Sequence, residues 1–103
     1  MGRPYSEKFL LSLSSADSNQ IGVQLGRLLV DANIPATYIA SALGVTRMTV
    51  YSWMRGQDIR RPKRKVVEAI VDLMKKDFEE GILPVPSRFD AKLYVQDLVG
   101  TEI

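Results

Sequence analysis

The sequence contains neither cysteine nor histidine, and these two absences remove much of the chemistry that enzymes use at neutral pH. Without cysteine there is no disulfide, no thiolate nucleophile and no soft ligand for zinc. Without histidine there is no imidazole base and no common transition-metal ligand. Lysine, carboxylate and tyrosine side chains remain, but they are gathered at no single place in the sequence. We therefore predict no catalytic residues, no metal site, no cofactor and no enzymatic activity.

Long apolar runs are also missing. No stretch approaches the about eighteen apolar residues that suggest a membrane span, and the start of the chain lacks the longer apolar segment of a secretory signal. We expect no membrane association and a cytoplasmic location. The composition, 46% hydrophobic and 25% charged over 103 residues, is that of an ordinary soluble protein. The length predicts a single domain over 1–103 with one core.

Residues 36–55 carry small, apolar and glycine residues at the spacing of two short helices joined by a tight turn. Ile39 and Leu43 lie four apart and share one face of the first helix. Ala40 is small where the second helix is expected to cross most closely. Gly44 suits the left-handed position that ends a helix, because glycine has no Cβ to clash there.

The second helix is predicted over 46–55. Thr46 is a natural N-cap, and Val50 and Trp53 lie three apart on the inner face. The remaining positions form an outer face that carries Arg47, Met48, Thr49, Tyr51, Ser52 and Arg55.

The outer face of this helix contains no acidic residue, and none occurs between Asp31 and Asp58. A helix that is merely solvated usually mixes both signs of charge. A helix that enters a groove lined by phosphates cannot carry negative charge there. The alternative is a pair of packed helices in an all-α domain that never contacts DNA.

The segment Thr37–Gln57 resembles the helix-turn-helix of the Cro and phage-repressor class, also called the Xre-like family. The residues at that family's core positions are Ile39, Ala40, Leu43, Gly44, Val45, Val50 and Trp53. The resemblance extends loosely over 17–80, which we predict to be the DNA-binding core. It implies a small phage-encoded regulator, acting in the cytoplasm or nucleoid of a bacterial host, whose helix 46–55 lies in the major groove of double-stranded DNA.

This resemblance implies base contacts along helix 46–55. Arg47 is the first candidate, because a guanidinium can bond both guanine acceptors, and Met48 or Thr49 suits a thymine methyl. The full predicted set is Thr46, Arg47, Met48, Thr49, Tyr51, Ser52 and Arg55. For Tyr51 the alternative is partial burial beside the core. The family often has a phosphate-contacting glutamine at the start of the first motif helix, where this chain has Ala36 and Thr37, so Thr37 is the predicted substitute.

Positive charge is concentrated next to the motif. The window 47–65 holds seven of the fourteen Lys and Arg residues and one acid, Asp58, so it carries +6 and the rest of the chain −4. Cations at the start of a helix oppose its macrodipole, a cost that a phosphate ligand would offset. The predicted phosphate contacts are Arg60, Arg61, Lys63, Arg64 and Lys65. The alternative is a solvated helix start.

Helical patterns flank the motif on both sides, so we predict an all-α bundle of about four to six helices. A short helix follows Ser6, and an amphipathic helix begins after a cap at Asp17 or Ser18. Gly22 and Gly26 weaken this helix, so we expect them to permit a close helix contact. Another helix starts at Pro62 and ends at Gly81, with an apolar stripe of Val66, Val67, Ile70, Val71, Met74 and Phe78.

The C-terminal extension, 82–103, is predicted to contain a last helix capped by Ser87, with a strand or a dimer arm as the alternative. Its apolar residues between Ile82 and Val99 exceed what a minimal bundle needs, so we expect a dimer interface there. A homodimer also fits the need of such proteins to bind two half-sites.

These observations favour a sequence-specific transcriptional regulator, most simply a repressor. Two alternatives stay open. One is a phage DNA-packaging or recombination accessory protein, which would form rings, and the other is a protein-interaction module directed at RNA polymerase or another part of the transcription machinery.

Overall fold

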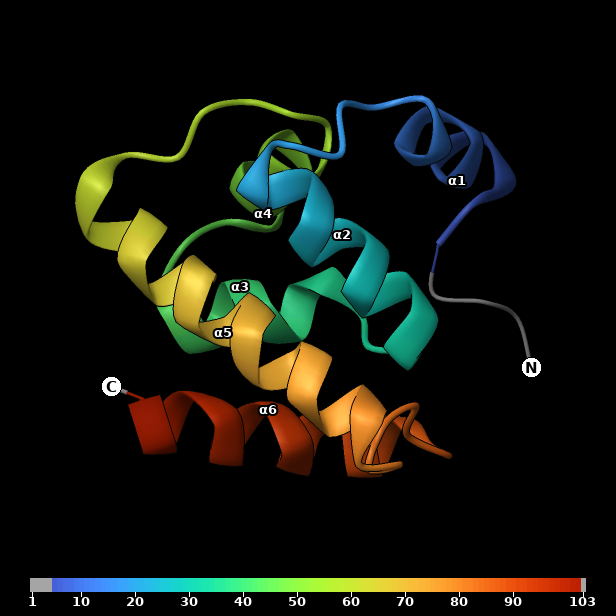
Figure 1. Cartoon of the computed structure of the whole chain (residues 1–103), viewed down its shortest axis with the longest axis vertical. Helices are drawn as coiled ribbons and strands as arrows, with labels where there is room; N and C mark the ends of the chain where they lie inside the picture. The colour runs from blue at the N-terminus through green and yellow to red at the C-terminus, as the bar shows by residue number, and fades with distance from the viewer. Residues whose placement is uncertain (1–4, 103) are drawn as a thin grey trace.

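The computed structural model describes residues 5–102 and folds them into six α-helices (Figure 1). The helices are α1 (Glu7–Ser14), α2 (Ile21–Ala32), α3 (Ala36–Leu43), α4 (Arg47–Met54), α5 (Arg61–Glu79) and α6 (Arg88–Glu102). No strand occurs among the described residues. The predicted all-α bundle is thus confirmed, and the C-terminal segment is a helix.

Local signals set most helix ends where they were predicted. The Ser6, Thr46 and Ser87 hydroxyls each accept a hydrogen bond from the backbone N–H three residues on, at 3.1–3.2 Å. Gly44, with φ of 70°, ends α3 in the left-handed region. Pro62 lies in the first turn of α5, as expected.

The predicted cap of α2 is wrong. α2 begins at Ile21 after Gln20, and no side chain caps it. The Asp17 carboxylate instead accepts the Asn19 N–H at 3.0 Å, and the Asp17 carbonyl accepts the Gln20 N–H. These two bonds close a local turn, which delays the start of the helix.

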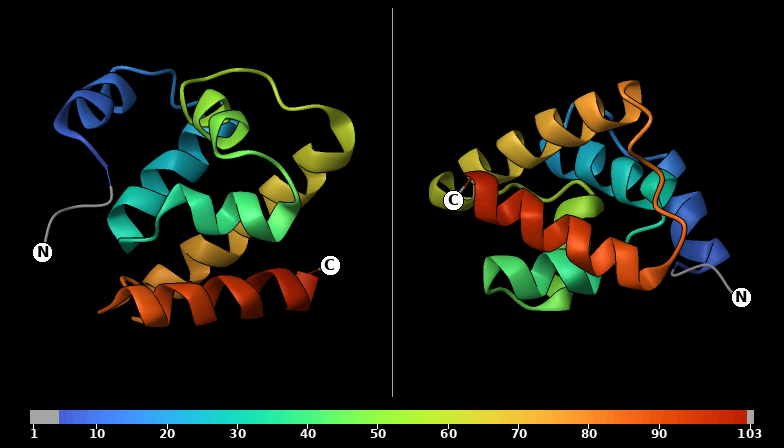
Figure 2. Two further views of the ribbon diagram at one scale, coloured as in Figure 1. Left: turned by 180° about the vertical axis from the view of Figure 1, so that it is seen from behind. Right: turned by 90° about the horizontal axis from the view of Figure 1, so that it is seen from below.

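The helices stack around the central α2. α2 packs against α4 and α5, α3 packs against α4, and α6 packs against both α3 and α5. Figure 2 shows the result from behind: α4 is seen nearly end-on above α3, with α1 on one side and the start of α5 on the other. α6 closes the end of the molecule opposite α4, packed across α3 and α5.

One apolar core runs from Tyr5 to Leu98. It includes residues on both sides of the segment 17–80, because Tyr5 and the C-terminal segment contribute to it directly. We expected the apolar residues between Ile82 and Val99 to exceed what the bundle needs. For five of them this expectation is wrong, because they are buried in the core: Leu83, Val85, Ala91, Val95 and Leu98. Those left exposed are Ile82, Phe89 and Leu93.

Two hydrogen bonds fix the segments before α1 and before α6 to the junction between α2 and α3. The buried Tyr5 hydroxyl donates to the Ile34 carbonyl at 2.6 Å, and the Val85 N–H donates to the Ala32 carbonyl at 3.2 Å. The segments before α1 and before α6 therefore hold the same corner of the core from two sides.

The two glycines of α2 allow α4 to approach closely, as predicted. A Cβ added at Gly22 would overlap the Trp53 carbonyl oxygen and lie 2.7 Å from its carbonyl carbon. A Cβ at Gly26 would lie 3.0 Å from the Met54 Cβ and 3.1 Å from the Leu13 Cδ1. Because the obstacle at Gly22 is backbone, no side-chain rotation can relieve it, and α4 itself would have to move.

We predict that Gly22→Ala lowers the free energy of unfolding by about 1–3 kcal/mol, the usual cost of overpacking, despite the better helix propensity of alanine. Gly100→Ala is the matched control, because no atom lies within 4 Å of a Cβ at that helical position. Urea denaturation followed by circular dichroism measures both. Equal stabilities of the two variants would show that α2 and α4 are not in this close contact.

Candidate nucleic-acid interface

The orientation of α4 is set by its inner face and by its cap. Val50, Trp53 and Met54 are buried against α2 and α3. The Thr46 hydroxyl caps the helix and also lies 2.9 Å from the Thr49 hydroxyl. These two threonines are therefore engaged with each other at the start of the helix, which limits their freedom to contact a ligand.

The outer face of α4 is exposed at its two ends. Arg47 and Met48 at the start and Arg55 just beyond the end are exposed, while Thr49 and Ser52 are half-buried. The Met48 side chain is 73% exposed, the highest exposure among the large apolar residues of the described chain. A methionine that its own fold leaves so exposed is available to a partner.

Tyr51 has a packing role that its prediction as a base-contacting residue did not include. Its ring lies edge-on to the Phe9 ring, with centroids 5.1 Å apart, and edge-on to Tyr5 at 6.2 Å. Burial raises the pKa of the Tyr5 hydroxyl, and the nearby Tyr51 raises it further. Tyr51 thus joins α1 to α4, in agreement with the alternative of partial burial.

A polar hollow of about 200 Å³ brings three predicted contact residues together. Its wall consists of the start of α3 at 35–38 with Arg47, Tyr51 and Arg88. Thr37, Arg47 and Tyr51 were predicted from the motif. Arg88 was not, because it lies far along the chain and only the packing of α6 on α3 brings it here. No local pattern signals such a neighbour.

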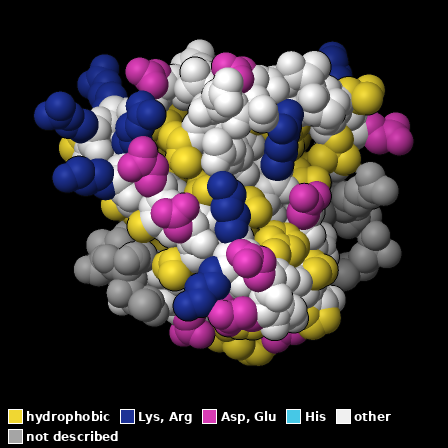
Figure 3. Space-filling view, in the orientation of Figure 1, with side chains coloured by type: hydrophobic (Ala, Val, Ile, Leu, Met, Phe, Trp, Pro, Cys, Tyr) yellow, Lys and Arg dark blue, Asp and Glu magenta, His cyan; other side chains and the backbone are white. Residues whose placement is uncertain are grey.

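The basic segment divides into free and engaged cations. Arg60, Arg61 and Lys65 are exposed and make no ion pair within the described residues. Figure 3 shows Lys and Arg side chains gathered over the start of α5. Of the five cations predicted to contact phosphates, these three are the ones that the fold leaves available.

The other two cations of this segment have partners in the chain. The Lys63 ammonium donates to the Leu43 carbonyl at 2.8 Å, at the C-terminal end of α3, where positive charge also favours the helix dipole. The Arg64 guanidinium lies 3.6 Å from Asp58 and 3.3 Å from Glu68. Lys63 therefore anchors the start of α5 to the turn between α3 and α4.

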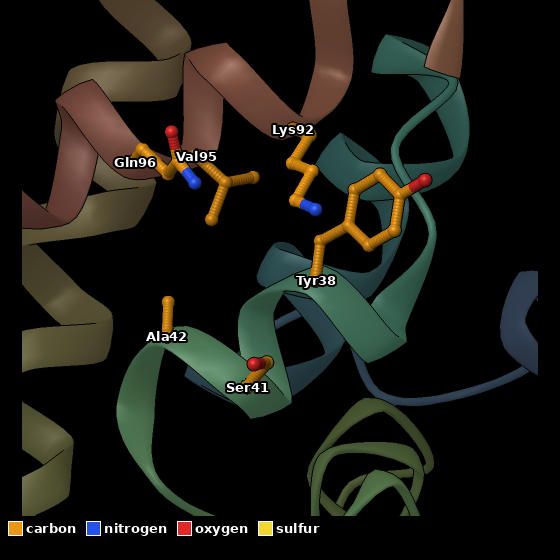
Figure 4. Close-up of a pocket in the computed structure, with 6 residues that line it drawn as sticks. All are labelled: Tyr38, Ser41, Ala42, Lys92, Val95 and Gln96. Atoms are coloured by element: carbon orange, nitrogen blue, oxygen red, sulfur yellow. The ribbon is translucent and has the colours of Figure 1, made fainter. Parts of the chain in front are cut away.

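A second hollow, of about 220 Å³, lies between α3 and α6 (Figure 4). Lys92 is the single charged residue in its wall, and Tyr38, Ala42 and Val95 make much of it apolar. Its polar groups are the Lys92 ammonium, the Tyr38 and Ser41 hydroxyls and the Gln96 amide, and no hydrogen bond joins any two of these side chains within the described residues. This hollow is a gap in the packing of α6 against α3, and none of the residues predicted to contact DNA lines it.

Among the described residues there is no cluster of three or more acidic side chains that could hold a metal ion, and no helix there is long and apolar enough to cross a membrane. Comparison with protein-family models, with curated proteins and with solved structures gives no match.

We predict that Lys63→Ala lowers the free energy of unfolding by about 1 kcal/mol, because it removes a charged hydrogen bond at the end of α3. Lys65→Ala removes the same charge from an exposed position and is expected to leave stability unchanged. Urea denaturation of the two variants separates the roles. A Lys63→Ala protein as stable as Lys65→Ala would mean that the bond to Leu43 contributes nothing.

Proposed function

We propose that this chain is a sequence-specific DNA-binding protein that regulates transcription, most simply as a repressor, by placing α4 in the major groove. The observation that carries the proposal is the outer surface of α4 beside the start of α5. It combines exposed cations with an exposed methionine, and no acidic side chain of α4 interrupts it.

The arrangement suits the two parts of DNA recognition. The major groove of B-DNA is wide enough for one helix, and base edges there offer both hydrogen-bonding groups and the thymine methyl. Met48 supplies an apolar contact, and Arg55 and Ser52 offer polar ones. The free cations Arg60, Arg61 and Lys65 would contact the flanking phosphates, which positions the protein without contacts to bases.

A homodimer completes the proposal. One helix contacts only a few base pairs, so proteins of this design bind two half-sites about one helical turn apart. Phe89 and Leu93 lie four apart on α6 and are exposed, which makes this helix face the candidate surface for the second copy. A contact with RNA polymerase is compatible with the same arrangement, but no residue is assigned to it.

Binding to duplex DNA is expected to weaken steeply with salt. If three to five cations each neutralise one phosphate, the plot of log affinity against log salt should have a slope of about −3 to −4.5 per chain. Fluorescence anisotropy of a labelled duplex at several salt concentrations measures it. Affinity that does not change with salt, or no binding at all, would refute the proposed function.

Met48→Ala should remove the preference for thymine at one position of the site. The loss of one methyl-sized apolar contact predicts a roughly three- to tenfold weaker affinity for the preferred duplex and no change for unrelated duplexes. Parallel selections from a random duplex library show the change in preference. Leu11→Ala is the matched control, because Leu11 on α1 is 72% exposed, like Met48, but lies outside the proposed surface. If both variants select the same sequences as the parent, Met48 does not contact a base.

A further inference from the structure

We propose that a backbone phosphate of the bound DNA occupies the polar hollow at the start of α3, held jointly by Arg47 of α4 and Arg88 of α6. This inference rests on the proposed function and goes beyond it in two respects. It adds the C-terminal helix α6 to the DNA interface, and it assigns Arg47 to a phosphate of the DNA backbone in place of a base edge.

The charged side chains in the wall of the hollow are all positive. Two guanidinium groups, from residues 41 positions apart in the sequence, line the same hollow, and none of the other residues in its wall is acidic. No acidic side chain of the wall offsets their charge, so the hollow is electropositive. An anion bound in the hollow would be attracted by both groups.

Both arginine side chains lack a partner among the described residues. Within the described residues neither Arg47 nor Arg88 makes an ion pair or a hydrogen bond, whereas Arg64 pairs with two carboxylates. The fold thus neutralises Arg64 internally and leaves the two cations of the hollow for an external group.

The chemistry of the wall matches a phosphate. The planar fork of a guanidinium fits phosphate oxygens in a bidentate manner. The Thr37 and Tyr51 hydroxyls in the same wall can donate to oxygens that the arginines leave free. At the start of α3 no side chain caps the helix, which leaves its first amide groups available as further donors.

The position of the hollow favours a phosphate diester of DNA over a free phosphate ion. It adjoins the first turn of α4, so it lies where the strand beside an occupied major groove would pass. The free cations at the start of α5 lie at the far end of α3, since Lys63 there bonds to Leu43. The arginines of the hollow and the free cations of α5 would then contact the DNA backbone on opposite sides of the inserted α4.

The test compares Arg88→Ala with Lys76→Ala, which removes one exposed cation from α5 outside the proposed surface. Arg88→Ala should weaken binding to preferred and random duplexes by the same factor and reduce the salt slope by about 0.9, the value for one phosphate. Lys76→Ala should change neither. Arg47→Ala should likewise weaken all sequences alike. Thermal unfolding by circular dichroism verifies that the variants are folded.

Unchanged affinity and slope in Arg88→Ala, with a parent protein that binds DNA, would overturn the inference while leaving the proposed function intact. So would an Arg47→Ala protein that loses preference at one base pair without weaker binding to random duplexes.

If the parent protein binds no duplex DNA, the proposed function fails. Titration with inorganic phosphate then tests separately whether the hollow binds an anion. Amide chemical shifts of Ala36 and Thr37 that respond to phosphate in the parent and in Lys76→Ala, but not in Arg88→Ala, would keep it as an anion site and remove DNA as its ligand. If these amide shifts respond to phosphate in none of the three proteins, the anion site is overturned as well.

Discussion

The close contact between α2 and α4 is the constraint on which the rest of the structure depends. α4 approaches α2 until the Trp53 carbonyl fills the space where Gly22 would otherwise carry a side chain. That approach buries Val50, Trp53 and Met54, and because a helix is rigid it turns the opposite face outward. The exposure of Arg47 and Met48 is therefore a consequence of packing on the other side of the helix.

Much of the fold was predictable because its signals are local. Helix caps at Ser6, Thr46 and Ser87, the glycine after α3 and the apolar stripes depend on residues three or four positions apart, so they are visible in the sequence. The core positions of α6 were not predictable in the same way. Ala91, Val95 and Leu98 are buried because α6 packs across α3 and α5. The sequence of the segment itself does not indicate which helices it packs against.

The candidate site shows the same division. The motif indicated which residues lie on the outer face of α4, but it did not show that the Tyr51 ring packs against Phe9 or that Lys63 bonds to Leu43. Both contacts join segments far apart in the sequence. Arg88 is the converse case, a residue with no motif around it that tertiary packing brings beside Arg47. The sequence thus showed where positive charge is concentrated, while the fold determines which cations of that basic segment are free of partners in the chain.

The central claim is that the outer face of α4, with the cations beside it, is the surface that contacts DNA. Its most direct test is to add a duplex carrying the selected sequence to isotopically labelled protein and follow the backbone amide signals by nuclear magnetic resonance. The account predicts that the largest changes fall within 46–55 and 60–65, with little change in the second half of α5. Changes confined to the outer face of α6 or to α1 would contradict it.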